Sequence, residues 1–293
     1  MKALIIGLGS VGLKHYNQLR GINSIKKIKV LSKRPKKNFP FIDKKNVKIY
    51  DPDYIIISNL TSEHLKTLKE INKLFINKLI LVEKPLFHKF YNFNSKRNKI
   101  FICYNMRFHP VIDYLKKHVS KKKFDYASIS CSTNLKKWRT NIKYYRSNTS
   151  KKTGGGALLE LSHELDYLEY IFGNYEIKYS VKKKLTKLKI ANDDFYHLIG
   201  TSKKLKYFDL KVSIFDNKEE RLIKLSNENN FIEADILKNK IKFFDGKKIY
   251  EKKFQKIDTL KEIHKKIISK KFLNICNLKE GKKILGKIRR FEY

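Results

Sequence analysis

Short runs of apolar residues recur through the first hundred residues of the chain, and segments with helical spacing lie between them. Four runs have the length and uniform apolar character of strands buried on both faces of a sheet: residues 2–6, 28–31, 54–58 and 78–82. Thr61 opens a segment to Phe75 with helical periodicity, and Val47–Tyr50 forms a further short candidate strand. Alternating strands and helices of this length predict a parallel sheet covered by helices.

Beyond about residue 120, apolar and polar positions alternate, which is typical of strands with one buried face. Turn residues separate the alternating segments, which lie at 126–133, 177–190, 195–200, 205–215, 220–225, 230–236 and 239–251. They predict a mostly antiparallel sheet, with a helix at 156–172 covering one face. Helical spacing returns after Asp258 or Thr259, where Thr259 and Glu262 fit a capping box, and again at 278–290.

A glycine-rich turn separates the first apolar run from the first helical segment. Gly7, Gly9 and Gly12 form the pattern G-x-G-x-x-G, in which the first glycine permits a tight turn, the second a close approach of pyrophosphate, and the third close packing. With Ser10 and Val11 they would present a helix N-terminus to phosphate. This predicts a dinucleotide site. The alternatives are a glycine-rich turn of another α/β protein, or a signal peptide, which the interrupting glycines argue against.

A length of 293 residues is enough for about two domains, and the change of pattern divides the chain. We expect an α/β protein with a Rossmann dinucleotide-binding domain at 1–118. An α+β domain with an open, mostly antiparallel sheet follows at 119–293, and the C-terminal helices could pack back on the first domain. No apolar stretch approaches the roughly 20 residues that span a bilayer, and the three cysteines are widely spaced, which predicts a cytoplasmic protein without a metal site.

The formal net charge of +39 raises the alternative of a nucleic-acid-binding protein. Only nine of the 67 basic residues are arginine, whereas proteins that recognise bases or phosphates rely heavily on Arg. The lysines accompany abundant Ile, Asn, Phe and Tyr, the residue types of AT-rich codons. We therefore expect solvated, lysine-rich surfaces and no specific nucleic-acid site.

Glu83-Lys84-Pro85 comes directly after the last predicted parallel strand. Residues just beyond the carboxyl ends of such strands line the ligand crevice of an open α/β sheet, so Lys84 should face the nicotinamide end of a cofactor. On the same ground we place four more residues at the cofactor: Asn59, Thr61, His64 and Glu83.

A second candidate segment runs from Gly154 to Asp166. At helical spacing Glu160, His163 and Asp166 share one face, and a carboxylate beside an imidazole can fix its tautomer and tune it for proton transfer. The alternative is a capped surface helix with a solvated acidic face.

The segments GLGSVGLKH, LVEKPL and GGGALLELSHELDYL, in this order and spacing, resemble the Gfo/Idh/MocA family of sugar and inositol oxidoreductases. The resemblance extends over essentially the whole chain and includes Tyr104–Pro110, which is similar to the YNxRF segment of that family. It implies a Rossmann domain, bound NAD or NADP, and a second domain that binds substrate and forms dimers or tetramers through its sheet. It also implies that Lys84 contacts substrate hydroxyl and cofactor, that His163 assists proton transfer, and that Asp166 matches the acidic residue three places later.

Two features depart from that family. Members often carry Asp-x-x-x-His where this chain has Glu160 only three residues before His163. The segment between Pro85 and Ile100 is short for the usual helix and poor in helical pattern.

The residues that follow the second apolar run indicate which nicotinamide cofactor the protein binds. The position that usually holds an acid for the ribose 2′-hydroxyl is Ser32, followed by Lys33 and Arg34. A hydroxyl and a guanidinium would accept a 2′-phosphate that a carboxylate would repel. The sequence therefore favours NADP over NAD and leaves NAD open.

Aromatic and arginine side chains gather just before the glycine run at 154–156. Aromatic rings stack on sugar faces, and Arg binds carboxylate or phosphate with two parallel hydrogen bonds. We assign substrate contacts to Arg107, Trp138, Arg139, Tyr145, Arg146, Glu160 and Asp166. The loop resembles those of family members from surface-polysaccharide sugar pathways, which favours an anionic or nucleotide-linked sugar; a packed surface loop is the alternative. A non-catalytic NAD(P)-binding sensor or assembly protein is the other function that the fold allows.

Overall fold

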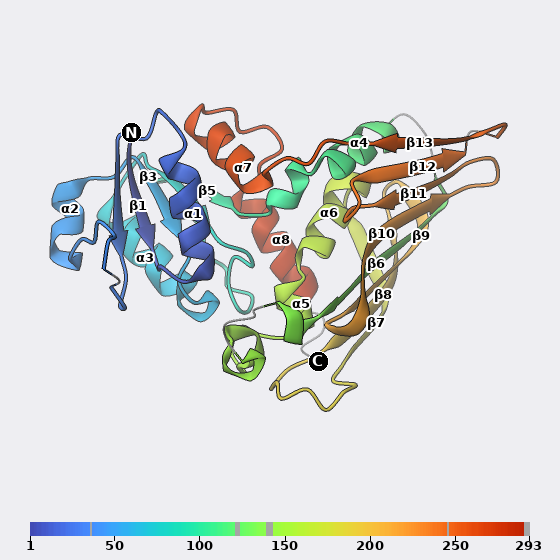
Figure 1. Ribbon diagram of the computed structural model, residues 1–293, viewed down its shortest axis with the longest axis horizontal. Coiled ribbons are helices and arrows are strands. Elements are labelled where there is room, and N and C mark those ends of the chain that lie inside the picture. The colour runs from blue at the N-terminus through green and yellow to red at the C-terminus, as the bar shows by residue number, and fades with distance from the viewer. Residues whose placement is uncertain (36, 121–123, 139–142, 245, 290–293) are drawn as a thin grey trace. The chain divides into compact units, whose positions relative to one another are not determined.

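The computed structural model describes residues 1–35, 37–120, 124–138, 143–244 and 246–289 (Figure 1). The chain forms two compact units: Met1–Asn105 with Asp258–Gly286, and Met106–Ile257 with the residues from Lys287. The predicted fold class, an α/β protein with a parallel sheet and a mostly antiparallel second sheet, is confirmed. The domain boundary between residues 118 and 119 stays a prediction. No helix in the described ranges is long and apolar enough to cross a membrane.

The sheet of the first unit has the order β2-β1-β3-β4-β5, and all of its strand pairs are parallel. Its strands are β1 (Lys2–Ile6), β2 (Lys27–Leu31), β3 (Tyr54–Ile57), β4 (Leu79–Val82) and β5 (Lys99–Ile102). The continuous apolar runs fit this place, because the side chains of β3 and β4 are buried on both faces of the sheet. The strand order reverses at β1, and ligands of open α/β sheets bind beyond the strands at such a switch point.

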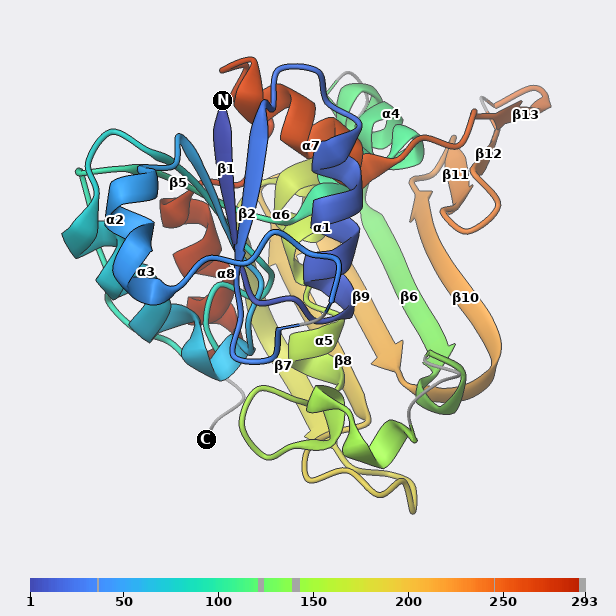
Figure 2. The same cartoon turned by 60° about the vertical axis from the view of Figure 1, so that its left-hand side comes forward.

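The helices of this unit come from both ends of the sequence (Figures 1 and 2). The first segment supplies α1 (Ser10–Arg20), α2 (Val47–Tyr50) and α3 (His64–Leu74), and the last supplies α7 (Thr259–Ile268) and most of α8 (Leu278–Arg289). The helix expected from Thr61 begins as a 3-10 turn at Thr61–Glu63. The cap of α7 is Asp258, whose carboxylate accepts from the backbone N–H groups of Leu260 and Lys261.

The prediction of a strand at Val47–Tyr50 is wrong, since these residues form α2. The free edge of the sheet on this side is β2, and there Val30 forms a bridge with Phe41 and not with residues 47–50. Ile49 is 84% exposed, so the segment also lacks a consistently buried face.

The connection between β4 and β5 contains no helix over Glu83–Asn98, in agreement with its weak helical pattern. Instead, α8 covers β5. Gly281 of α8 lies so close to Ile102 that an added Cβ would be 2.7 Å from the Ile102 Cγ1 atom. Cys276 O accepts from the Ile102 N–H at 2.9 Å, so the C-terminal segment also pairs with this edge of the sheet.

The sheet of the second unit has eight strands in the order β13-β12-β11-β10-β6-β9-β8-β7. Only the β6–β9 pair among these is parallel. The strands are β6 (Tyr126–Asn134), β7 (Tyr175–Lys183), β8 (Phe195–Ser202), β9 (Leu205–Ser213), β10 (Phe215–Ser226), β11 (Phe231–Asp235), β12 (Lys240–Phe244) and β13 (Ile249–Lys253). The segment expected at 239–251 is thus two strands.

The helices of the second unit are α4 (Pro110–Val119), α5 (Ala157–Glu160) and α6 (His163–Phe172). α4 packs with α6, and α5 lies against β8 and β9. The single helix expected at 156–172 is wrong, because the chain leaves the helical path at Leu161–Ser162. The Leu161 carbonyl accepts a hydrogen bond from the Tyr196 hydroxyl at 3.0 Å, and Asp193 accepts from the Leu158 N–H at 2.8 Å at the start of α5.

Candidate functional site

The turn between β1 and α1 leaves room for a ligand beside its second glycine. Gly7 has φ +96°, and a Cβ on Gly12 would lie 2.0 Å from the Gly7 carbonyl oxygen, so both positions need glycine for the fold itself. A Cβ on Gly9, by contrast, would meet no described atom within 4 Å. Gly9 is also the N-cap of α1, so no side chain caps this helix end. The first-turn N–H groups, including those of Ser10 and Val11, fit the pyrophosphate of a dinucleotide.

The three residues predicted to select the cofactor directly follow β2. The Ser32 hydroxyl accepts from the Arg34 N–H at 3.3 Å, and Arg34 is exposed. The Lys33 ammonium lies 2.5 Å from Glu63, a carboxylate that the sequence prediction did not include. An acid therefore stands beside this region, contributed by the turn before α3 and not by β2.

The predicted cofactor residues after β3 are buried or form hydrogen bonds with other groups of the protein. Asn59 donates to Thr67 Oγ1 at 2.8 Å and to Glu63 at 3.3 Å, and Thr61 is buried. His64 is also buried: its Nε2 lies 3.2 Å from the Asn59 carbonyl, and its Nδ1 lies 3.2 Å from the carbonyls of Pro85 and Leu86. Burial lowers the pKa of His64, although these carbonyls oppose the shift.

Lys84 follows β4 and is half-buried. Its N–H donates to Glu83 Oε2 at 3.1 Å, and Glu83 Oε1 lies 2.8 Å from His15 Nε2. Burial by itself would raise the pKa of Glu83, but its hydrogen bond with His15 and further contacts outweigh this and lower the pKa. Glu83 and His64 thus hold the backbone on either side of Lys84.

One group among the described residues offers three side chains of metal-ligating type: His15, Glu83 and Cys103, with ligand atoms within 4.8 Å of one another. Two donors around a tetrahedral zinc lie about 3.3 Å apart, which follows from metal–ligand distances near 2 Å. The 2.8 Å between His15 and Glu83 is a hydrogen bond, and burial holds the pKa of the Cys103 thiol well above its usual value. The three side chains therefore form a hydrogen-bonded cluster.

The second unit contains His163, the other predicted catalytic residue, at the start of α6 and half-buried. Asp166 follows three residues later on the same helix. Glu160 does not share their face, because it ends α5 and accepts from Thr149 Oγ1 at 2.7 Å. The expectation that three groups share one helical face is therefore wrong for Glu160.

Two buried ion pairs hold α6 in this unit. Arg107 donates from Nε and Nη2 to the Asp166 carboxylate at 2.7–3.1 Å, and both side chains are at most 4% exposed. Arg221 of β10 lies 2.7 Å from Glu164, which is fully buried. Neither Glu164 nor Arg221 was singled out from the sequence, because their pairing joins positions 57 residues apart.

The remaining predicted substrate residues lie between β6 and α5. Trp138 donates from Nε1 to Thr133 Oγ1 at 2.8 Å. Tyr145 is 40% exposed, with the Lys189 ammonium 6.0 Å from its ring centre, and Arg146 is exposed beside it. Arg139 lies outside the described residues.

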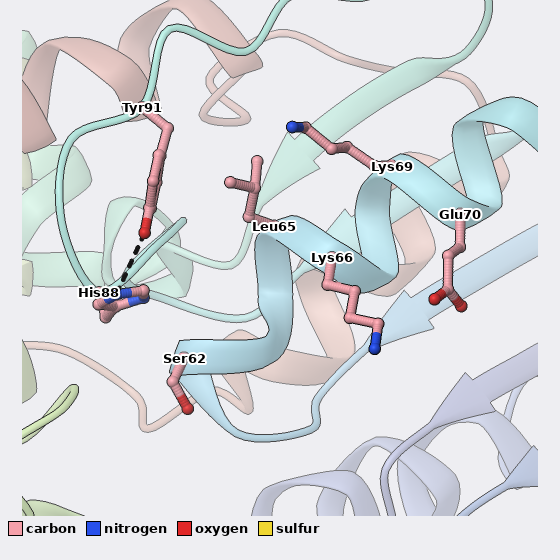
Figure 3. Close-up of a pocket in the computed structure, with 7 residues that line it drawn as sticks. All are labelled: Ser62, Leu65, Lys66, Lys69, Glu70, His88 and Tyr91. Carbon is pink, nitrogen blue, oxygen red and sulfur yellow. Dashed lines mark hydrogen bonds between the residues drawn. The ribbon is translucent and has the colours of Figure 1, made fainter.

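A shallow hollow of about 400 Å³ opens on the first unit between α3 and the β4–β5 connection (Figure 3). The Tyr91 hydroxyl lies 3.3 Å from His88 Nε2, and two lysines of α3 border the same space. Its lining residues are Ser62, Leu65, Lys66, Lys69, Glu70, His88 and Tyr91. None of the residues predicted for the site lines it.

Comparison with known proteins finds structural likeness only. No protein-family model matches the sequence, and no curated protein matches it. UDP-N-acetylglucosamine 3-dehydrogenase GnnA from Acidithiobacillus ferrooxidans is similar with a TM-score of 0.78 and 14% identity, covering 100% of this chain and 99% of that chain. The WlbA dehydrogenase from Bordetella pertussis, in complex with NADH and UDP-GlcNAcA, has a TM-score of 0.76 and 14% identity, covering 100% and 95%.

A putative NADPH-dependent oxidoreductase from Desulfitobacterium hafniense has a TM-score of 0.77 and 13% identity, covering 97% of this chain and 92% of that chain. At these identities the likeness establishes the fold, which this chain shares along nearly its whole length with all three proteins.

Proposed function

We propose that this protein is an NAD(P)-dependent oxidoreductase that transfers a hydride between the nicotinamide and a hydroxyl-bearing carbon of a sugar. The observation that carries the proposal is the pairing of two features in one unit. The uncapped start of α1 with open space at Gly9 suits a dinucleotide, and Lys84 stands at the end of β4, held by Glu83 and His64. The fold shared with named dehydrogenases adds support.

Lys84 would exchange the proton of the reacting hydroxyl, while the bound nicotinamide accepts or supplies the hydride. Its neighbours fix its backbone, so the side chain alone has to move between proton donor and acceptor positions. His163 of the second unit would relay this proton or act as an alternative base. In this proposal residues 1–118 bind the cofactor and residues 119–293 bind the substrate.

NADP is the favoured cofactor, because Ser32 stands directly after β2 where an acid is usual, and the exposed Arg34 offers a guanidinium. Glu63 works against a 2′-phosphate, but Lys33 neutralises it at 2.5 Å. NAD therefore stays the second choice, and direct titration decides between them.

The substrate class we favour is an anionic or nucleotide-linked sugar of surface-polysaccharide biosynthesis. Tyr145 and Arg146 offer an exposed ring and an exposed guanidinium, the groups that stack on sugars and bind anions. GnnA and WlbA are named for, or bound to, UDP-linked sugars.

A homodimer or homotetramer through the second sheet is part of the proposal, as is a cytoplasmic location. One face of that sheet packs under α5 and α6, whereas the other carries exposed apolar side chains. By strand register they share this face: Tyr126, Tyr179, Ile199, Tyr207 and Phe231.

The alternative is a non-catalytic NAD(P)-binding protein on the same fold. Fluorescence titration with NADPH and NADH, followed by a turnover screen over nucleotide-linked and free sugars, separates the two. Cofactor binding with turnover of a sugar supports the enzyme, and tight cofactor binding without turnover of any sugar supports the alternative.

A further inference from the structure

Four buried side chains from distant parts of the sequence form one hydrogen-bonded chain in the first unit. The Tyr54 hydroxyl of β3 lies 2.8 Å from His264 Nδ1 of α7, and His264 Nε2 lies 2.9 Å from His15 Nδ1 of α1. His15 Nε2 then lies 2.8 Å from Glu83 Oε1. Tyr54, His15 and His264 are fully buried, and the Glu83 side chain is 13% exposed.

The chemistry of the four groups favours one direction for these hydrogen bonds. Glu83, ionised, accepts from His15 Nε2–H, which leaves Nδ1 of a neutral His15 as an acceptor. His264 must then donate from Nε2, and its own Nδ1 accepts from the Tyr54 hydroxyl. Burial holds the pKa of His264 well below its usual value, in keeping with a neutral ring.

If His15 were cationic, its Nδ1 would donate to His264, and the hydrogen bonds between His15 and His264 and between His264 and Tyr54 would both reverse. His264 would then donate to the Tyr54 oxygen, and the Tyr54 hydrogen would need another acceptor. Within the described residues the hydroxyl of this fully buried tyrosine has His264 as its hydrogen-bond partner. A buried hydroxyl without an acceptor is costly, so the neutral arrangement is favoured.

The hydrogen-bonded chain ends at Glu83, which precedes the proposed catalytic residue Lys84. The second oxygen of Glu83 accepts the Lys84 N–H at 3.1 Å. His15, one link before it, stands on α1, the helix whose first turn suits the cofactor phosphates. The hydrogen bonds therefore join the cofactor helix directly to the lysine segment, and α7, which follows both by more than 150 residues in the sequence, connects that helix to β3.

We propose that Tyr54 and His264 are positioning residues for Lys84: together they orient the His15 ring through the hydrogen bond to its Nδ1, which keeps Glu83 aligned as the acceptor of the Lys84 N–H. This rests on the proposed function for the role of Lys84. Positioning groups of this kind act through the side chains that they orient, and their loss commonly costs a factor of ten or more.

Tyr54→Phe tests the direction of the chain by removing one oxygen atom. With no hydroxyl to accept from, His264 is free to carry its hydrogen on Nδ1, which removes its hydrogen bond to His15 Nδ1, whereas His15 keeps its hydrogen on Nε2 because Glu83 still accepts it. Ring ¹⁵N spectra should show both histidines as Nε2–H tautomers in the unmodified protein and a redistribution of His264 toward Nδ1–H in Tyr54→Phe. We expect kcat to fall roughly 10- to 100-fold with the cofactor Kd unchanged.

Tyr50→Phe is the matched control. The Tyr50 hydroxyl donates to the backbone carbonyls of Ala3 and Lys27, both at 3.1 Å. It lies in the same unit but takes no part in the hydrogen-bonded chain from Tyr54 to Glu83. It should leave the histidine spectra and kcat unchanged even where it lowers stability. Unchanged tautomers in Tyr54→Phe, or a kcat equal to that of Tyr50→Phe, would overturn the proposal.

His264→Gln and His264→Leu provide a second pair if Tyr54→Phe does not fold. The Gln amide offers a donor and an acceptor of fixed identity, so it should retain most of kcat, whereas Leu should lose it. Equal losses in both variants would reject the positioning role. The ring spectra need no turnover, so absence of NAD(P)H binding by the unmodified protein would separately reject the proposed function and, with it, the role of the chain at Lys84.

Discussion

At the residue scale, Lys84 differs from the many other lysines by the buried groups that hold its backbone. Glu83 accepts its N–H, and His64 faces the carbonyls of the next two residues. A lysine on an exposed loop spreads over many rotamers, and holding its backbone reduces that freedom. Substitution at Lys84 should therefore change chemistry far more than substitution of a neighbouring lysine.

Lys84→Met keeps the bulk of the stem and removes the ammonium. We expect turnover to fall at least ~10²-fold, as for a lost acid–base group, with the cofactor Kd little changed. Lys89→Met is the control, because Lys89 is exposed in the same connection and lies 5.5 Å from the ring centre of Tyr91. Steady-state kinetics that show the same turnover for both variants would contradict the role of Lys84.

Cofactor choice can be tested by Ser32→Asp combined with Arg34→Ala. The charge-assisted hydrogen bond of a guanidinium with a 2′-phosphate contributes roughly 1.5–3 kcal/mol, or one to two decades of affinity. NADPH should bind more weakly and NADH equally or better, by fluorescence titration. Arg97→Ala removes a guanidinium elsewhere in the unit, where Arg97 donates to the Asn72 carbonyl, and serves as the control. Equal weakening of both cofactors would reject a role for Arg34.

His109 makes stability depend on pH. Burial, followed by the charge of Arg221, lowers its pKa to about 4, whereas the unfolded chain has a value near 6.5. Between these values the unfolded state binds more protons, so stability falls as pH decreases, by at most about 1.4 kcal/mol per pH unit from this residue.

His109→Asn should reduce this dependence while keeping an acceptor for the Val111 N–H at the start of α4. Urea unfolding at pH 7, 6 and 5 measures the free energy of unfolding of both proteins. His64 and His264 titrate in both, so the difference between the two slopes isolates His109. Parallel slopes would mean that His109 is not the titrating group.

At the element scale, α8 takes the covering role that a helix between β4 and β5 would otherwise have. Gly281 permits its close approach to Ile102, which is fully buried. Gly286, in the same helix, has no described atom within 4 Å of an added Cβ. Substitution of the two glycines by Ala therefore distinguishes the effect of helix propensity from the effect of packing against β5.

Gly281→Ala should destabilise the protein by about 1–3 kcal/mol, because Ile102 has to repack around the new methyl group. Gly286→Ala should stabilise it by up to about 1 kcal/mol through helix propensity. Thermal unfolding of the two variants checks both signs. A stabilising Gly281→Ala would show that α8 can move away from β5 at little cost.

At the scale of the whole molecule, the sequence predicts what depends on local pattern. The apolar runs at 54–58 and 78–82 identify buried parallel strands, and the spacing of Gly7, Gly9 and Gly12 identifies the turn between β1 and α1. The break at Leu161–Ser162 was not predictable, because apolar spacing continues through it and its cause includes Tyr196, 35 residues away. The contact between His15 and His264 likewise joins residues 249 positions apart.

The first unit is built from both ends of the polypeptide, and this affects how the unit forms during synthesis. The strands β1 to β5 leave the ribosome first, but His264, the edge pairing by Cys276 and the cover of α8 arrive only after roughly 160–180 further residues. At 5–20 residues per second this delay is roughly 10–40 s. During that time the nascent sheet has an open edge at β5, and His15 lacks its hydrogen-bond partner His264. We therefore expect nascent chains that end before Asp258 to be held by chaperones or cleaved by proteases, even though they contain every strand of that sheet.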